Sequence, residues 1–195
     1  MYVTHNRRMK QPFEFVVADI PRAQELIDSA WPTRIITVLG RSNASKPFIE
    51  STGDHHLRVV VDDVAQPQPH MILPSRRMVD QILKFSKDFS SEDRVLVHCR
   101  YGLGRSTSVM IGILVQHGMA PADAIAAVHA QRPHMDSNEM FLYHFDNALH
   151  QGLRIMEAYD AWSKQVSYTP RNRLPRLWWQ EIRSNIQELI RTGQY

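Results

Sequence analysis

The stretch from Arg94 to His117 constrains the fold more than any other part of the chain. It begins with Arg94–Val97, a short and continuous apolar run of the kind found in buried parallel strands. A segment with two glycines, residues 98–105, follows at once, and the pattern of residues 106–117 predicts a helix. A buried strand that passes through a tight loop directly into a helix indicates an α/β fold.

The rest of the chain repeats this alternation. Apolar, β-branched runs predict strands at 13–18, 34–39 and 57–61. Helical patterns cover 75–89, 122–130 and 138–149, and a shorter helix follows Asp19 and Pro21. We therefore expect a central, mostly parallel sheet of four to five strands flanked by helices, with a long loop at 62–74 that contains three prolines.

The length of 195 residues suits one domain with an appendage. We place the main domain in residues 1–150 and a helical C-terminal extension in residues 151–195. Tyr168 to Pro175 is the expected linker within the extension. Beyond it lies an apolar stripe formed by Leu177, Trp178, Ile182, Ile186, Leu189 and Ile190. We expect this stripe to pack on the protein's own domain, on a second copy or another partner, or on a membrane surface.

Charge and composition exclude few partners. The net charge is +3, and basic residues gather near both ends, as Arg7, Arg8 and Lys10 and as Arg171, Arg173 and Arg176. These ends either attract an anionic partner or are simply solvated. We expect no nucleic-acid partner, no membrane span and no secretory signal, and hence a cytoplasmic protein. The single cysteine, Cys99, fits a reducing compartment.

The loop after the buried strand has the composition of an anion site. Gly102 and Gly104 let the backbone fold tightly, so that successive N–H groups point inward. The following helix adds its positive N-terminus, and Arg105 supplies a planar fork that matches two phosphate oxygens. Such surroundings stabilise a thiolate, so we expect Cys99 to be an ionised nucleophile, with Ser106 as a hydrogen-bond donor to its sulfur. The competing interpretation is a tight turn with a buried cysteine.

The segment from His98 to Ser106 reads HCRYGLGRS. It resembles the His-Cys-(five residues)-Arg-Ser/Thr signature of the protein tyrosine and dual-specificity phosphatase superfamily, and the surrounding chain looks more like small bacterial predicted tyrosine phosphatases. The resemblance extends from about Val59 to Leu149. It implies that His98 orients the loop without pairing with the thiolate, and that the loop amides bind phosphate, at Arg100, Tyr101, Gly102, Leu103, Gly104 and Arg105. A rhodanese-like sulfur transferase is an alternative with a similar cysteine, although its loop is usually shorter.

Asp62 and Asp63 open the proline-rich loop, where the family carries its general acid. Because alternation along a strand sends neighbouring side chains to opposite faces, only one of them should serve, and we favour Asp63. A pair of solvated turn residues is the competing interpretation.

The segment 131–142, QRPHMDSNEMFL, resembles the Arg-Pro…Pro-Asn…Phe segment of dual-specificity enzymes, with Ser137 in place of the usual proline. The resemblance implies that Asn138 braces the phosphate loop, while an N-cap role is equally open. The ten histidines show no metal-ligand spacing, so we expect neither metal nor cofactor.

The expected function is hydrolysis of phosphate monoesters through a phosphocysteine, on protein phosphotyrosine or also on phosphoserine and phosphothreonine. The alternatives are a non-protein substrate, such as an inositol phosphate or an RNA 5′-phosphate, and a pseudophosphatase that binds phosphoproteins without turnover.

Overall fold

The described part of the computed structural model, residues 11–41 and 54–166, contains one four-stranded sheet. The strands are β1 (Glu14–Ala18), β2 (Arg34–Leu39), β3 (His56–Val60) and β4 (Arg94–His98). They lie in the order β1-β4-β2-β3 and all pairs are parallel. The predicted α/β fold is confirmed, with the lower of the two expected strand numbers.

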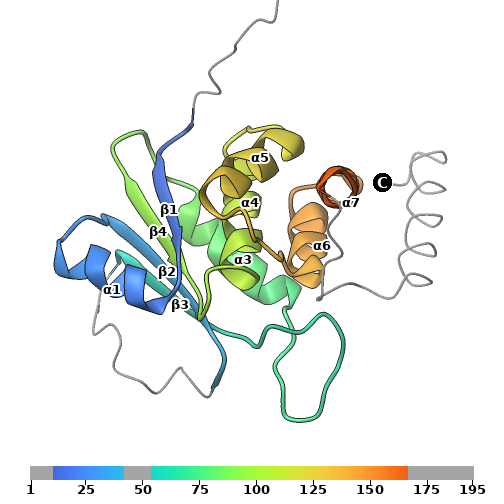
Figure 1. Ribbon diagram of the computed structural model, residues 1–195, viewed down its shortest axis with the longest axis horizontal. Helices are drawn as coiled ribbons and strands as arrows, with labels where there is room; N and C mark the ends of the chain where they lie inside the picture. Colours follow the sequence, from blue (N-terminus) through green and yellow to red (C-terminus); the bar gives the residue numbers. More distant parts are fainter. Residues whose placement is uncertain (1–10, 42–53, 167–195) are drawn as a thin grey trace, which may run out of the picture.

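Helices cover both faces of the sheet (Figure 1). On one face lies α1 (Ile20–Asp28), which begins at an N-cap formed by Asp19, whose Oδ1 accepts from the backbone N–H of Arg22. The other face carries five helices (Figure 1), namely α3 (Arg76–Ser86), α4 (Arg105–Gln116), α5 (Pro121–Gln131), α6 (Glu139–Ala148) and α7 (Arg154–Gln165). The expected helices are therefore present, although α3 ends three residues earlier than its pattern predicted.

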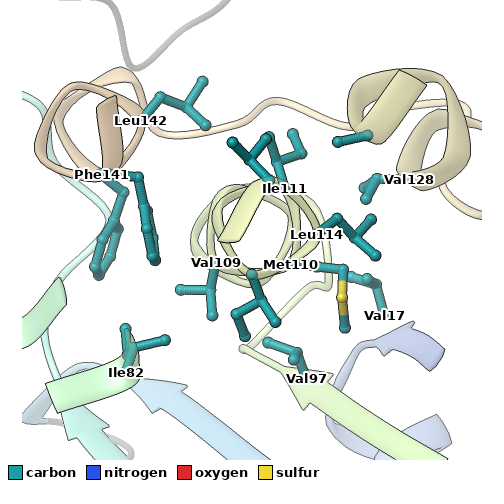
Figure 2. Close-up of a cluster of buried hydrophobic side chains, with 14 of the residues drawn as sticks. Val17, Ile82, Val97, Val109, Met110, Ile111, Leu114, Val128, Phe141 and Leu142 are labelled. Carbon is teal, nitrogen blue, oxygen red and sulfur yellow. The ribbon is translucent and has the colours of Figure 1, made fainter. Parts of the chain in front are cut away.

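Helix α4 is the centre of the main core. It packs against β1, β2 and β4 of the sheet and against α3, α5 and α6 (Figure 2). All its residues from Arg105 to Val115 are buried. A side chain at Gly112 would collide with the Phe145 ring, so this glycine lets α4 and α6 approach closely. Because α4 is held on all sides, the loop that leads into it has a rigid base.

Helix α7 was not predicted at its observed position. It begins after Leu153, which has a left-handed backbone (φ 73°) and no capping side chain of its own. The cap comes from Asp146 in α6, whose carboxylate accepts from the N–H groups of Leu153 and Ile155 at 2.6 and 2.8 Å. Burial raises the pKa of Asp146, and these backbone donors oppose the shift. Leu153, Ile155, Met156 and Tyr159 join the main core, so the first part of the expected extension packs on the domain.

The outer edge of β1 is covered by a side chain. Gln131, at the end of α5, accepts from the N–H of Val17 at 3.2 Å and donates to the C=O of Phe15 at 2.8 Å. Its amide group thus meets one donor and one acceptor of the edge strand, as a neighbouring strand would.

Several predictions fall outside the described residues. These are the basic residues near the two ends, the Tyr168–Pro175 linker and the apolar stripe from Leu177 to Ile190. The boundary at residue 150 stays a prediction. Among the helices of residues 11–41 and 54–166, none combines the length and hydrophobicity that crossing a bilayer requires.

Candidate active site

The predicted site residues meet at one edge of the sheet. Parallel strands end on the same side, and ligands of open α/β sheets bind outside these carboxyl ends. Cys99 follows β4, and Asp62 and Asp63 follow β3 after Val61. The pairing of His98 with both Ala18 and Thr37 sets the ends of β1 and β4 level, while β2 continues to Leu39. The loop 99–105 therefore begins between the end of β1 and the last residues of β2.

Cys99 lies at the bottom of this loop and is only 1% exposed. Its Sγ accepts two hydrogen bonds of 3.2 Å, from the backbone N–H of Gly102 and from the hydroxyl of Ser106. Both donors stabilise negative charge on the sulfur. The structure thus brings Gly102 and Ser106 to Cys99, and the sulfur is the acceptor that both of them share.

The curvature of the loop depends on Gly102. This residue has φ 67°, and a Cβ there would lie 2.6 Å from the carbonyl carbon of Ala18 at the end of β1. Any other residue would be strained in backbone and too close to the sheet. Glycine at this position is therefore required both by the turn and by the close approach.

The carbonyl groups of the loop are held from outside. Arg132 donates to the C=O of Tyr101 at 2.7 Å and of Gly102 at 3.0 Å. The backbone N–H of Asp136 donates to the C=O of Leu103, and the Thr107 hydroxyl donates to the same oxygen or to that of Gly104. Because these carbonyls are bound on the outer side, the opposite ends of the peptides can present N–H groups inward.

Arg105 is the first residue of α4 and is buried (6% exposed). One guanidinium nitrogen, Nη1, donates to the C=O of Val61 at 2.8 Å, at the end of β3. Its Nε lies 3.9 Å from Oδ2 of Asp63. The fork is thus anchored at one corner, which fixes the direction of the rest of the group.

Asp62 and Asp63 have different partners, as the alternation argument predicted. Asp62 closes its loop: its N–H donates to the C=O of Ile72 at 2.9 Å, and its Oδ2 accepts from the N–H of Ile72 at 2.8 Å. Asp63 instead turns towards the phosphate loop, where a Cβ on Gly104 would collide with its carboxylate. Of the two, Asp63 is the one whose carboxylate faces Gly104 and lies within ion-pair distance of Arg105.

Asn138 has a capping role and a bridging role. Its Oδ1 accepts from the N–H groups of Met140 and Phe141, which caps α6. Its Nδ2 donates to Oδ1 of Asp63 and to the C=O of Val64, both at 3.1 Å. The side chain therefore binds the loop of Asp63. The direct contacts to the phosphate loop come from Arg132 and Asp136, earlier in the same segment.

His98 ties the end of β4 to its neighbours. Its Nε2 is 2.7 Å from the hydroxyl of Thr37, which is also 2.7 Å from Nε2 of His56. Burial, together with the nearby charge of His56, lowers the pKa of His98 to about 4, and a hydrogen bond with the Cys99 backbone only partly opposes this. The imidazole is therefore neutral at neutral pH, in keeping with an orienting role and not with an ion pair to the sulfur.

The rim of the loop is formed by Arg100, Tyr101 and Leu103. Tyr101 is 61% exposed, and the guanidinium of Arg100 lies 5.0 Å from the centre of its ring. Leu103 is partly buried. An aromatic face and a cation therefore stand beside the entrance, on the same loop as the nucleophile.

Sequence reasoning missed two parts of the site. It noted Arg132 only as part of a resembling segment, although an arginine before Pro133 is the one signal that could have drawn attention to it. Thr37, in the middle of an apolar strand, is buried between two histidines. A polar residue in such a run is the signal of a buried hydrogen-bond partner.

Comparison with known proteins agrees with this geometry. The family model described as "Polymorphic toxin system, DSP-PTPase phosphatase" matches residues 23–119, a range that includes Asp63, Cys99 and Arg105. None of the curated proteins compared with the chain matches it.

Solved phosphatase structures have the same fold. The PTP-2 phosphatase of Cydia pomonella is 15% identical with a TM-score of 0.54, over 71% of this chain and 87% of that one. PTPMT1 in complex with PI(5)P is 16% identical with a TM-score of 0.52, over 71% and 91%. The human tyrosine phosphatase-like serine/threonine/tyrosine-interacting protein is 22% identical with a TM-score of 0.50, over 73% and 91%. At these identities the likeness concerns the fold.

The chain thus has the fold of the dual-specificity phosphatases. Over residues 23–119 its sequence is also similar to a phosphatase family of the dual-specificity and protein tyrosine type.

Proposed function

We propose that the protein hydrolyses phosphate monoesters through a phosphocysteine intermediate, with Cys99 as nucleophile, Arg105 as phosphate clamp and Asp63 as general acid. The observation that carries the proposal is the arrangement around the sulfur. Two donors point at Cys99 Sγ, and the Asp63 carboxylate faces the same loop next to Arg105. A nucleophile, an anion clamp and a proton donor are the groups that such a displacement needs.

In the first step the Cys99 thiolate attacks phosphorus, and the bond from phosphorus to the ester oxygen breaks. Asp63 gives its proton to the departing oxygen, while Arg105 and the loop N–H groups bind the equatorial oxygens. In the second step the Asp63 carboxylate takes a proton from water, which attacks phosphorus and breaks the bond to sulfur. The Ser106 hydroxyl, 3.2 Å from Sγ, stabilises the thiolate as it leaves.

Phosphotyrosine in a protein is the substrate we propose. Its aryl ring would extend from the phosphate towards the rim, where the exposed Tyr101 ring and Arg100 stand. Aromatic stacking suits an aryl ester better than the short side chains of phosphoserine and phosphothreonine. A phosphoinositide is the second candidate, because Arg100 also offers a cation at the entrance and PTPMT1, a structural neighbour, was crystallised with PI(5)P.

The test is a substrate panel with the full chain in metal-free buffer. It contains p-nitrophenyl phosphate, a phosphotyrosine peptide, the matched phosphoserine peptide and vesicles with PI(5)P. We expect kcat/KM on the phosphotyrosine peptide to exceed that on the phosphoserine peptide and the vesicles by about tenfold or more. Preference for the vesicles would replace the protein substrate by a lipid, and binding of the peptide without turnover would replace the enzyme by a pseudophosphatase.

The two aspartates can be separated by isosteric substitutions. We expect Asp63→Asn to lower kcat on phenyl phosphate by roughly 10²–10⁴-fold, because the poor leaving group then departs without a proton. Asp62→Asn is the matched control; it keeps an oxygen for the N–H of Ile72 and should cost far less. In steady-state kinetics across pH, Asp63→Asn should lose the fall in kcat on the basic side of the profile, and Asp62→Asn should keep it. The reverse pattern would assign the acid to Asp62.

A further inference from the structure

The segment between α5 and α6, residues 132–138, touches both loops of the candidate site. Arg132 and Asp136 bind the phosphate loop through the carbonyls of Tyr101, Gly102 and Leu103. Asn138 binds the loop that carries Asp63. One short piece of chain thus sets the position of the proton donor relative to the nucleophile's loop.

Asn138 is well fixed for such a task. It is completely buried. Its Oδ1 is held by the N-terminus of α6, and its backbone C=O accepts from the Ser108 hydroxyl of α4 at 3.2 Å. The amide nitrogen is therefore directed at the Asp63 loop by two helices of the core, and a side chain so restrained loses little entropy when it binds its target.

The loop of residues 62–74 is held both by bonds within itself and by contacts with other parts of the fold, such as that of the Pro74 C=O with His144. The bonds between Asp62 and Ile72 join its two ends. The bonds from Asn138 to Oδ1 of Asp63 and to the C=O of Val64 run across to another part of the fold, more than seventy residues along the chain. Val64 and Ala65 are buried next to this point. Asn138 is thus a fixed external partner at the place where the loop carries its carboxylate.

The chemistry of the amide adds a second consequence. The NH₂ group of Asn138 is a donor only, and the C=O oxygen of a protonated carboxyl is a better acceptor than its hydroxyl oxygen. The bond to Oδ1 of Asp63 therefore favours the form of the carboxyl that carries its proton on Oδ2. Oδ2 is the oxygen that approaches Gly104 and Nε of Arg105, at 3.9 Å from the latter. The amide thus directs the acidic proton towards the phosphate loop.

We propose that Asn138 is a positioning residue for general acid catalysis, which acts through Asp63 by holding its loop and by assigning the proton to Oδ2. This inference rests on the proposed function, in which Asp63 is the general acid. It makes proton donation to the leaving group, and not phosphate binding, the step that depends on Asn138.

The test uses Asn138→Ser in the full chain. Serine keeps an N-cap acceptor for α6 but lacks the NH₂ donor. We expect kcat/KM on phenyl phosphate, a poor leaving group, to fall by roughly tenfold or more, and that on p-nitrophenyl phosphate by less than about threefold. In the Asp63→Asn background the same substitution should add no further loss specific to phenyl phosphate, because the two residues act in one step.

The outcomes separate the two claims. Equal losses on both substrates, or a full extra loss on top of Asp63→Asn, would overturn the role of Asn138 while the general acid stands. If Asp63→Asn itself loses no more on phenyl phosphate than on p-nitrophenyl phosphate, the general acid is overturned and this inference with it. Thermal unfolding of each variant identifies any loss of folded protein. A structural defect alone would not depend on the leaving group.

Discussion

Cys99→Ser is expected to abolish turnover, with a loss of at least about 10⁴-fold on every phosphate ester, because a serine hydroxyl at this position is far less ionised and less nucleophilic than a thiol. The same variant should keep its affinity for the phosphotyrosine peptide. The clamp residue Arg105 and the outer bonds from Arg132 that shape the loop do not involve the sulfur. The variant should thus form a stable complex that does not react.

Two measurements decide this prediction. Initial rates with p-nitrophenyl phosphate report turnover, and titration calorimetry with the phosphotyrosine peptide reports binding. Rapid acid quench of the wild type during turnover should also yield phosphate bound to the protein, and the serine variant should yield none. Residual activity of Cys99→Ser near the wild-type level would place the nucleophile elsewhere.

Arg105→Lys should lower kcat/KM by at least about 10³-fold, although the charge is kept. A lysine ammonium is a point donor and cannot bind two phosphate oxygens while another corner holds the C=O of Val61, as the guanidinium does at 2.8 Å. Inhibition by orthovanadate should weaken in parallel, because the same fork would bind the trigonal oxygens.

Arg34→Lys is the matched control for this substitution. Arg34 is partly buried and, like Arg105, lies close to an aspartate, Asp93 at 3.0 Å, but it is at the opposite end of β2 from the site. Its replacement should leave kcat/KM within about threefold of the wild type. Similar losses in both variants would show that arginine is needed for folding and not for phosphate binding.

The order of strands and helices could be predicted because each element carries its own signal. β2 was placed to the residue, and the start of α1 was expected at Asp19 and Pro21. Local patterns of this kind are set within a few residues. α7 lacked them, because its cap is supplied by Asp146 from the preceding helix.

The candidate site also has a part that the sequence alone could predict and a part that it could not. The loop from His98 to Ser106 is contiguous, so sequence alone indicated its chemistry. Alternation along a strand predicted that only one of Asp62 and Asp63 serves, and their different partners, Ile72 and Arg105, are in keeping with it. The bonds of Arg132 to the loop and of Asn138 to Asp63 span about thirty and seventy-five residues. No local pattern encodes such pairs.

The amide of Gln131 on the edge of β1 has a consequence for association between molecules. An edge strand with open N–H and C=O groups is a template onto which a strand of another chain can add. Gln131 occupies the N–H of Val17 and the C=O of Phe15, so an incoming strand would first have to displace it. In the described part of the chain, one glutamine side chain thus protects this edge of the sheet from edge-to-edge pairing with another molecule, and so from aggregation.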